Sequence, residues 1–185
     1  MVAKMRNGGA ACTAANRILV QRGVADEFVE RVVNRMTSLT VGSGLDPASQ
    51  VGPMVNEAER SRLLDLVQAA RSGGARVHSS GAAPDAGFFH APTVLTDVTA
   101  DAPILRTEIF GPVAPVVVFD TVDEAIAIAN DTDAGLVAYL FTEGLDRGLS
   151  VSRRLESGMV GLNRGLVSDP AAPFGGVKHS GIGRE

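Results

Sequence analysis

The feature that most constrains the fold is an alternation of short, β-branched apolar runs with longer amphipathic segments. RILVQ at residues 17–21 is typical of a strand, and residues 24–39 repeat apolar side chains at helical spacing. Further strand patterns lie at 76–79, 92–98, 115–119, 137–142 and 159–163, with helical patterns at 122–130 and 145–156. Strands that alternate with helices favour parallel pairing, so the sequence predicts an α/β fold with a mixed, mostly parallel sheet flanked by helices.

Capping residues predict where two of the helices begin. Asn56 followed by Glu59 is typical of a helix N-terminus, and the glycine pair at 73–74 is typical of its end. Thr121 with Glu124 predicts a second capping box. The spacing predicts that these side chains face inward: Phe28, Val29, Val32, Val33, Met36 and Leu39 in the first helix, and Leu63, Leu64 and Val67 in the second.

Length, charge and hydropathy exclude several classes of protein. The 185 residues suit one domain, predicted to span 1–185, and carry a net charge of −4. This acidic balance gives no basis for binding nucleic acid or an anionic membrane. No apolar run is long enough to span a bilayer, the start lacks a signal-peptide core, and a single cysteine forms no intrachain disulfide. We therefore expect a cytoplasmic protein.

The only cysteine, Cys12, lies in the small-residue stretch RNGGAACTAANR at residues 6–17. Thiolates are the reactive form of cysteine, and nearby cations favour them. Arg6 and Arg17 flank the stretch, while its glycines and alanines leave room for a substrate to approach the sulfur. The residues alone leave two readings open: a loop nucleophile, or a small buried thiol packed like alanine.

Other catalytic arrangements have weaker support. A cysteine hydrolase requires a histidine beside the sulfur and a third group to orient it. The candidates are His78, His90 and His179, of which His179 lies in a glycine-rich stretch that could reach a site. One cysteine and three separated histidines show no metal-ligand spacing, so no metal site is predicted. No glycine pattern typical of a phosphate cradle occurs either.

Four segments together identify a known family. The segments are NGGAACTAANR around Cys12, TEIFGPV at 107–113, ANDTDAGLVAYLFT at 129–142 and APFGGVKHSGIGRE at 172–185. They resemble the catalytic domain of NAD(P)-dependent aldehyde dehydrogenases, in the same order and over essentially the whole chain. GSGLDP, NDTDAGL and GLVSDPAAPFGG are most similar to the succinate-semialdehyde dehydrogenase subgroup. The resemblance implies the catalytic-domain fold of that family.

The resemblance also implies roles for individual residues. Cys12 would attack the aldehyde carbon, hydride would pass to the nicotinamide, and water would hydrolyse the resulting thioester. Glu108 matches the glutamate that holds the nicotinamide ribose, and Phe110 matches the residue beside the nicotinamide ring. Phe174 matches an aromatic side chain of the substrate tunnel.

Within the succinate-semialdehyde subgroup, Arg6 and Ser168 match positions that hold the distal carboxylate of the substrate. Arginine suits this role because its planar fork of donors fits a carboxylate. One position departs from the family pattern. Ala10, two residues before the cysteine, stands where glutamine or glutamate is usual, which removes a polar group from the loop.

The resemblance further implies that this chain is one part of an enzyme. The nucleotide-binding domain, an asparagine that stabilises the oxyanion and the general-base glutamate would precede Met1, and an oligomerisation segment would follow Glu185. We therefore expect NAD or NADP in the complete enzyme, neither bound to this chain alone, and an aldehyde as substrate. The alternative is a non-catalytic subunit or remnant that joins a partner carrying the missing domain, or a homo-oligomer. The glycine-rich C-terminus is predicted to lack a closing element.

Overall fold

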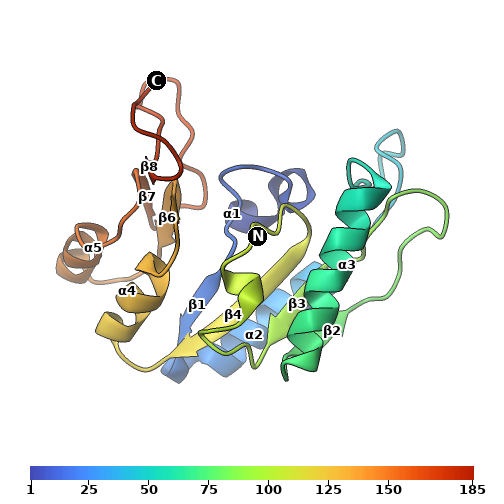
Figure 1. Cartoon of the computed structure of the whole chain (residues 1–185), viewed down its shortest axis with the longest axis horizontal. Helices are drawn as coiled ribbons and strands as arrows, with labels where there is room; N and C mark the ends of the chain where they lie inside the picture. Colours follow the sequence, from blue (N-terminus) through green and yellow to red (C-terminus); the bar gives the residue numbers. More distant parts are fainter. The chain divides into compact units, whose positions relative to one another are not determined.

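The computed structural model describes all residues from Met1 to Glu185, and these form two compact units (Figure 1). The N-terminal unit covers residues 3–118 and the C-terminal unit covers residues 119–185. Each unit has its own strands and helices. The expectation of a single catalytic domain across 1–185 therefore stays a prediction.

The N-terminal unit is built on a four-stranded sheet with the order β1-β4-β3-β2. Its strands are β1 (Ile18–Gln21), β2 (Arg76–Ser79), β3 (Thr93–Thr96) and β4 (Val113–Phe119). β3 and β4 are parallel, with Thr93 opposite Val113, whereas β2 runs antiparallel to β3. The sheet is thus mixed and has helices against it, which confirms the predicted fold class.

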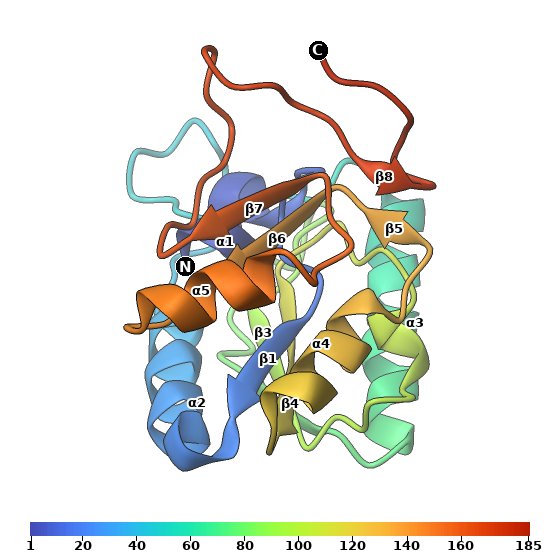
Figure 2. The same cartoon turned by 90° about the vertical axis from the view of Figure 1, so that its left-hand side faces the viewer.

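Two sixteen-residue helices cover the two faces of this sheet, α2 (Arg22–Thr37) and α3 (Glu57–Ser72) (Figure 2). Met36 of α2 is fully buried and clusters with Val20, Val94 and other apolar side chains of the sheet. Burying a side chain of this size contributes about 1.5–3 kcal/mol, so this cluster contributes substantially to the unit's stability. A short 3₁₀ helix, η2 (Pro103–Leu105), packs against α3.

The predicted boundaries of α2, α3 and α4 are correct to within two residues, but two side chains are more exposed than expected. The Asn56 side chain accepts a hydrogen bond from the Glu59 amide (2.9 Å), which confirms the cap of α3. Phe28 is 36% exposed and Leu64 is 42% exposed, although both were expected to face inward. Each lies at the margin of an apolar stripe that is wider than the surface its helix buries.

The C-terminal unit contains two small sheets (Figure 2). β6 (Val137–Leu140) is parallel to β7 (Met159–Leu162), and β5 (Ala134–Gly135) is antiparallel to β8 (Val177–Lys178). The helices are α4 (Val122–Asn130) and α5 (Leu145–Ser152). The Thr121 hydroxyl accepts a hydrogen bond from the Glu124 amide (3.2 Å), which confirms the predicted cap of α4.

Two short backbone pairings hold the C-terminal segment, and the expectation that it lacks a closing element stays a prediction. β8 pairs with β5, and Phe174 and Glu185 exchange two backbone hydrogen bonds of 2.9 Å. α5 ends at Ser152, four residues before the predicted boundary at 156. A two-residue strand is too short to show a periodic pattern, so β5 and β8 could not be predicted from the sequence.

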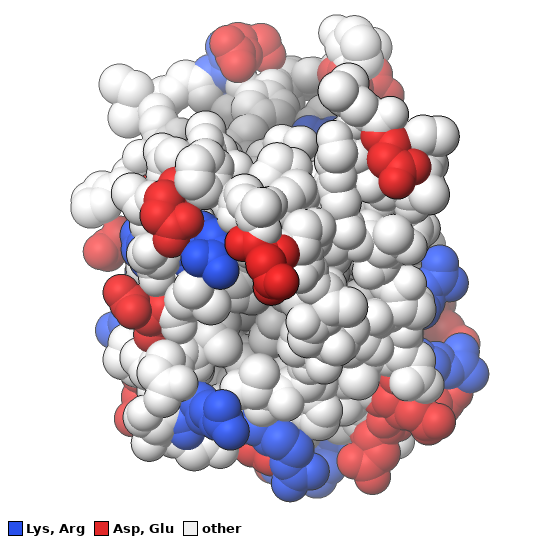
Figure 3. All heavy atoms as spheres, turned by 90° about the vertical axis from the view of Figure 1, so that its right-hand side faces the viewer, with Lys and Arg blue, Asp and Glu red and all other residues white.

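Charges of both signs are interspersed on the molecular face that Figure 3 shows. On α3, Arg60 pairs with Glu57 and Arg62 pairs with Glu59 across one helical turn. No helix combines the length and the apolar character needed to cross a bilayer.

Candidate functional site

Cys12 lies on a loop, here called the nucleophile loop (residues 7–16), that begins with a run of left-handed backbone. It follows α1 (Val2–Met5) and overlaps the short 3₁₀ segment η1 (Arg6–Gly9). Asn7, Gly8 and Gly9 have φ values of 52°, 61° and 82°. The Asn7 side chain and backbone both bond to Ala10, at 2.8 and 3.0 Å. This turn redirects the chain just before the cysteine.

The Cys12 side chain is exposed, so the reading of a small buried thiol is wrong. The next residue, Thr13, is buried and fixes the loop against the unit. The guanidinium of Arg6 donates a long hydrogen bond of 3.5 Å to the Thr13 hydroxyl. The positively charged Arg6 therefore lies beside Thr13, the residue that follows Cys12.

The second part of the site is the 107–111 loop, which leads into β4 and carries two predicted residues. Glu108 is exposed, and Phe110 is 39% exposed with a left-handed φ of 46°. An aromatic residue in this conformation costs about 1–3 kcal/mol and persists only where its surroundings enforce it. Ile109, between them, is fully buried.

Two side chains hold the backbone of the 107–111 loop. Asn16, four residues after Cys12, donates to the Thr107 carbonyl (2.9 Å) and accepts from the Ile109 amide (2.8 Å). Arg62 of α3 donates to the carbonyls of Glu108 (2.9 Å) and Ile109 (3.1 Å), while its Nε bonds to Glu59 (2.9 Å). The backbone on both sides of Glu108 is therefore fixed without using its carboxylate.

The two loops also touch through their glycines. A Cβ on Gly9 would overlap the Gly111 carbonyl oxygen, and a Cβ on Gly111 would lie 2.7 Å from a Leu63 methyl. Only glycine permits such close backbone packing. The N-terminal unit thus places Cys12 on the nucleophile loop, Arg6 just before it, and Glu108 and Phe110 on a second loop that contacts it.

The remaining predicted residues, Ser168 and Phe174, belong to the C-terminal unit. Both are half-buried in the segment that connects β7 to β8. Phe174 is held by its backbone pairing with Glu185. That these two residues border the same site as Cys12 stays a prediction.

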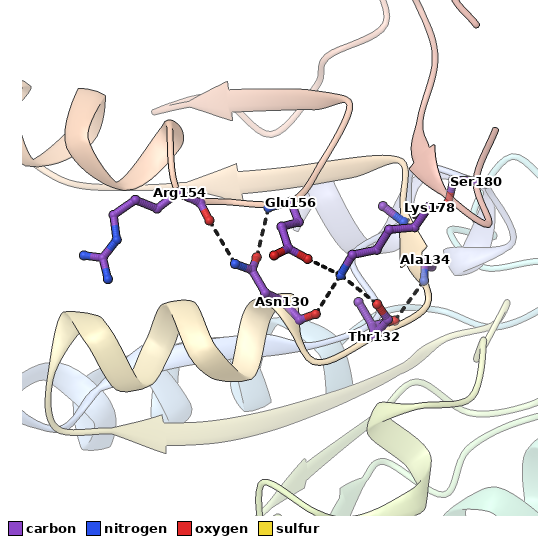
Figure 4. Close-up of polar contacts among 8 residues, drawn as sticks. Asn130, Thr132, Ala134, Arg154, Glu156, Lys178 and Ser180 are labelled. Atoms are coloured by element: carbon purple, nitrogen blue, oxygen red, sulfur yellow. Dashed lines mark hydrogen bonds and ion pairs between the residues drawn. The ribbon is translucent and has the colours of Figure 1, made fainter. Parts of the chain in front are cut away.

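The C-terminal segment is anchored by a polar network around Lys178 (Figure 4). The Lys178 ammonium donates to the carbonyls of Asn130 (2.8 Å) and Thr132 (2.9 Å) and forms an ion pair with Glu156. The Asn130 side chain in turn bonds to the Arg154 carbonyl and the Glu156 amide, both at 2.9 Å. The network ties β8 to the end of α4 and to the turn before β7.

The three histidines are placed as follows. His78 bonds to the Thr96 hydroxyl (2.9 Å) across the β2–β3 pair. His90 is buried, its Nδ1 has no hydrogen-bond partner, and burial lowers its pKa. His179 is exposed in the C-terminal unit. Neither histidine of the N-terminal unit is hydrogen-bonded to Cys12, which gives no support to a cysteine hydrolase built within that unit.

Asn16 and Arg62 contribute to the site but were not singled out from the sequence. In the sequence, Arg62 is typical of a surface ion pair with Glu59, three residues before it. Its bonds to Glu108 and Ile109 join positions 46 and 47 residues apart, so no local sequence pattern indicates them. Asn16 stands beside an arginine in the ANR stretch near the cysteine. Its position in a segment used for the family resemblance is the only signal that could have drawn attention to it.

Comparison with known proteins shows the family to which the chain belongs. The aldehyde dehydrogenase family model matches residues 1–185, and the chain belongs to that family. It is 53% identical to succinate-semialdehyde dehydrogenase of Paenarthrobacter nicotinovorans, over the whole chain and 41% of the relative. Two solved structures also match. Aldehyde dehydrogenase from Brucella melitensis biovar abortus 2308 has TM-score 0.95 and 47% identity, over 100% of this chain and 38% of that one. The NAD⁺ complex of Bacillus cereus aldehyde dehydrogenase has TM-score 0.94 and 37% identity, over 98% and 37%.

These values also show how much of a relative the chain represents. It spans about two fifths of the length of the proteins it matches. The resemblance inferred from the four sequence segments is therefore confirmed at the level of the family.

Proposed function

We propose that this chain is the nucleophile-bearing part of an NAD(P)-dependent aldehyde dehydrogenase that oxidises succinate semialdehyde to succinate. The observation that carries the proposal is the exposed Cys12 on a loop in direct contact with the 107–111 loop. The similarity to succinate-semialdehyde dehydrogenase supports the choice of substrate.

Cys12 forms the covalent bond to the substrate. Its sulfur attacks the aldehyde carbon, the C–O double bond becomes a single bond, and the oxygen takes up the negative charge or a proton. Loss of hydride from that carbon leaves a thioester on Cys12, which water hydrolyses to the carboxylate and the free thiol. The small residues around Cys12 leave the sulfur accessible for both the attack and the hydrolysis.

Arg6 selects a substrate with a distal carboxylate. Its guanidinium lies beside Thr13, next to the nucleophile, and has donors left over after the single long bond to that hydroxyl. In the C-terminal unit, Ser168 and Phe174 match family positions for a carboxylate anchor and an aromatic side chain of the substrate tunnel, and we propose these roles for them.

The residues of the 107–111 loop fit a nicotinamide cofactor. Glu108 presents an exposed carboxylate, which can accept hydrogen bonds from ribose hydroxyls, on a backbone that other side chains hold. Phe110 presents an exposed ring that can lie against the nicotinamide. When bound, NAD⁺ or NADP⁺ supplies the hydride acceptor.

A second candidate, a subunit that acts by association, is favoured by apolar side chains on the C-terminal unit. Phe141 is 64% exposed, Leu145 is 66% exposed and Leu149 is 44% exposed, all on or just before α5. Exposed apolar side chains gathered in this way are typical of interfaces. If the chain sediments as a monomer over the whole concentration range measured, this second candidate is contradicted.

The proposed function is tested by protection of Cys12 from alkylation. Succinate semialdehyde should slow carbamidomethylation of Cys12 by iodoacetamide at about one tenth the concentration that butanal requires, because only the former carries a carboxylate for Arg6. Arg6→Gln should remove this difference, and the matched surface variant Arg153→Gln should retain it. Equal protection by the two aldehydes, or none by either, would overturn the proposal.

A further inference from the structure

The side chain of Asn16 contacts the 107–111 loop at both ends of Glu108. Its Nδ2 donates to the carbonyl just before Glu108, and its Oδ1 accepts from the amide just after it. The partners lie 91 and 93 residues away in sequence, so these bonds join two segments that are distant along the chain. The amide group is suited to this role because it presents a donor and an acceptor in one plane.

The bonds act on a stretch of backbone that needs outside support. Phe110 adopts a left-handed conformation, and the residue before it, Ile109, is held at its amide by Asn16 and at its carbonyl by Arg62. Without the bond from Asn16, the strained conformation of Phe110 would be enforced from one side only. The backbone conformation at Phe110 is therefore supported in part by a residue of the nucleophile loop.

The nucleophile loop meets the 107–111 loop at two points, one on each side of Cys12. Gly9 packs against the Gly111 carbonyl three residues before the cysteine, and Asn16 bonds four residues after it. A segment attached at both ends moves with the body to which it is attached. Cys12 and the Glu108–Phe110 pair are thus set relative to each other by contacts within this one unit.

From this arrangement we propose that Asn16 is a positioning residue, which couples the nucleophile to the cofactor-facing loop through a two-way amide contact. The proposal rests on the function proposed above and adds a residue to it. Asn16 itself touches neither substrate nor cofactor in this scheme. It fixes Glu108 and Phe110 through the backbone at residues 107 and 109.

The chemistry of the amide gives a specific test. Asn16→Asp keeps the acceptor for the Ile109 amide but, when ionised, places a negative charge against the Thr107 carbonyl. A protonated aspartic acid restores a donor, so lowering the pH toward about 4, where an aspartic acid becomes substantially protonated, should restore the contact. Asn16→Ala lacks both groups and should show no recovery at any pH.

Two readouts follow the coupling in the whole chain. Because the protein has no tryptophan, Phe110→Trp places a single indole on the loop, whose exposure can be measured by acrylamide quenching. In this background Asn16→Ala should raise the quenching constant. In the chain with Phe110 intact, Asn16→Ala should change the Cys12 alkylation rate about five-fold, because a five-fold change corresponds to the free energy of one hydrogen bond. In Asn16→Asp, quenching should return toward the parent value as the pH falls.

A matched control lies in the other unit, where Asn163 also bridges a backbone amide and carbonyl, both on Thr142 at 2.8 Å. Asn163→Ala should leave the quenching and the Cys12 alkylation rate unchanged. The proposal is overturned if Asn16→Ala alters neither readout, or if Asn16→Asp and Asn16→Ala follow the same pH curve. Should Asn16→Ala fail to fold by circular dichroism, the pH series of Asn16→Asp decides alone.

The outcomes separate this proposal from the proposed function. Loss of protection by succinate semialdehyde in the parent chain would count against the function while leaving the quenching results intact. If succinate semialdehyde protects Cys12 normally but the quenching does not respond to substitution of Asn16, the coupling proposed here is overturned. The proposed function is then unaffected.

Discussion

The 107–111 loop of the N-terminal unit and the 172–185 segment of the C-terminal unit both match family motifs, but they are held in different ways. The first has a fully buried residue at its centre, Ile109, and bonds from side chains on two separate elements. The second is held by a two-residue strand, its own backbone pairing and one exposed lysine. The part of the site around Cys12 is therefore pre-organised within its unit, whereas the predicted substrate-side residues depend on a few solvent-exposed contacts.

The largest effect is expected from breaking the glycine contact of the firmly held region. Gly9→Ala would place a Cβ against the Gly111 carbonyl at a backbone φ of 82°, which combines a steric clash with backbone strain. We expect a loss of roughly 3 kcal/mol or more in the free energy of unfolding, measured by urea titration. Gly44→Ala, where a Cβ would meet nothing within 4 Å, should change stability by less than about 0.5 kcal/mol. Equal stability of the two variants would show that the loops are not in contact.

A gain in stability is expected from removing the buried amine of Lys4, which lies in α1 just before the nucleophile loop. Lys4 is 4% exposed, and burial lowers its pKa from 10.5 to about 8. Between these two pH values the unfolded chain binds more protons than the folded chain, so the contribution of Lys4 to stability rises with pH across that window. Below about pH 8 the folded protein bears the full cost of a buried cation.

Lys4→Met should therefore stabilise the protein at neutral pH by up to about 3 kcal/mol, because each tenfold change in the proton affinity of Lys4, or one pKa unit, corresponds to about 1.4 kcal/mol. The gain should shrink as the pH approaches 10.5. Urea titrations of both proteins at neutral and alkaline pH provide the measurement. A gain that does not vary with pH would mean that the substitution acts through packing and that the ammonium is not desolvated.

A smaller and more local effect is expected from the weakly held region. Lys178→Met removes two hydrogen bonds to carbonyls and an ion pair whose lysine side chain is 27% exposed, at a cost of about 1–2 kcal/mol. Hydrogen exchange should accelerate in residues 174–185 and stay unchanged in residues 107–111. Glu156→Gln, which removes only the ion pair, should cost less than about 1 kcal/mol. Faster exchange in both regions would contradict the view that they are held independently.

Local signals in the sequence predicted the elements well. The range 76–79 coincides with β2, the predicted helix 122–130 coincides with α4, and both capping side chains make their expected bonds. These features depend on neighbouring residues and on hydrophobic period, which a single sequence displays. The misplaced Phe28 and Leu64 show the limit, because the width of a helix's buried face is set by what packs against it.

The site was predictable only in part, for a related reason. Cys12 was found because it is the single cysteine, and its exposure agrees with the reading of a loop nucleophile. The glycine contact and the bonds of Asn16 and Arg62 join residues far apart in sequence, so neither composition nor spacing indicates them. The roles of Ser168 and Phe174 came from the resemblance alone and remain predictions.

The central claim is that Cys12 is an accessible nucleophile that accepts an acyl group, and acylation measured by intact mass tests it most directly. Treatment of the folded chain with 4-nitrophenyl acetate should add a single acetyl group, located on Cys12 by peptide mapping and absent from Cys12→Ser. An unmodified Cys12 in folded protein, under conditions that acylate a simple thiol, would contradict the account.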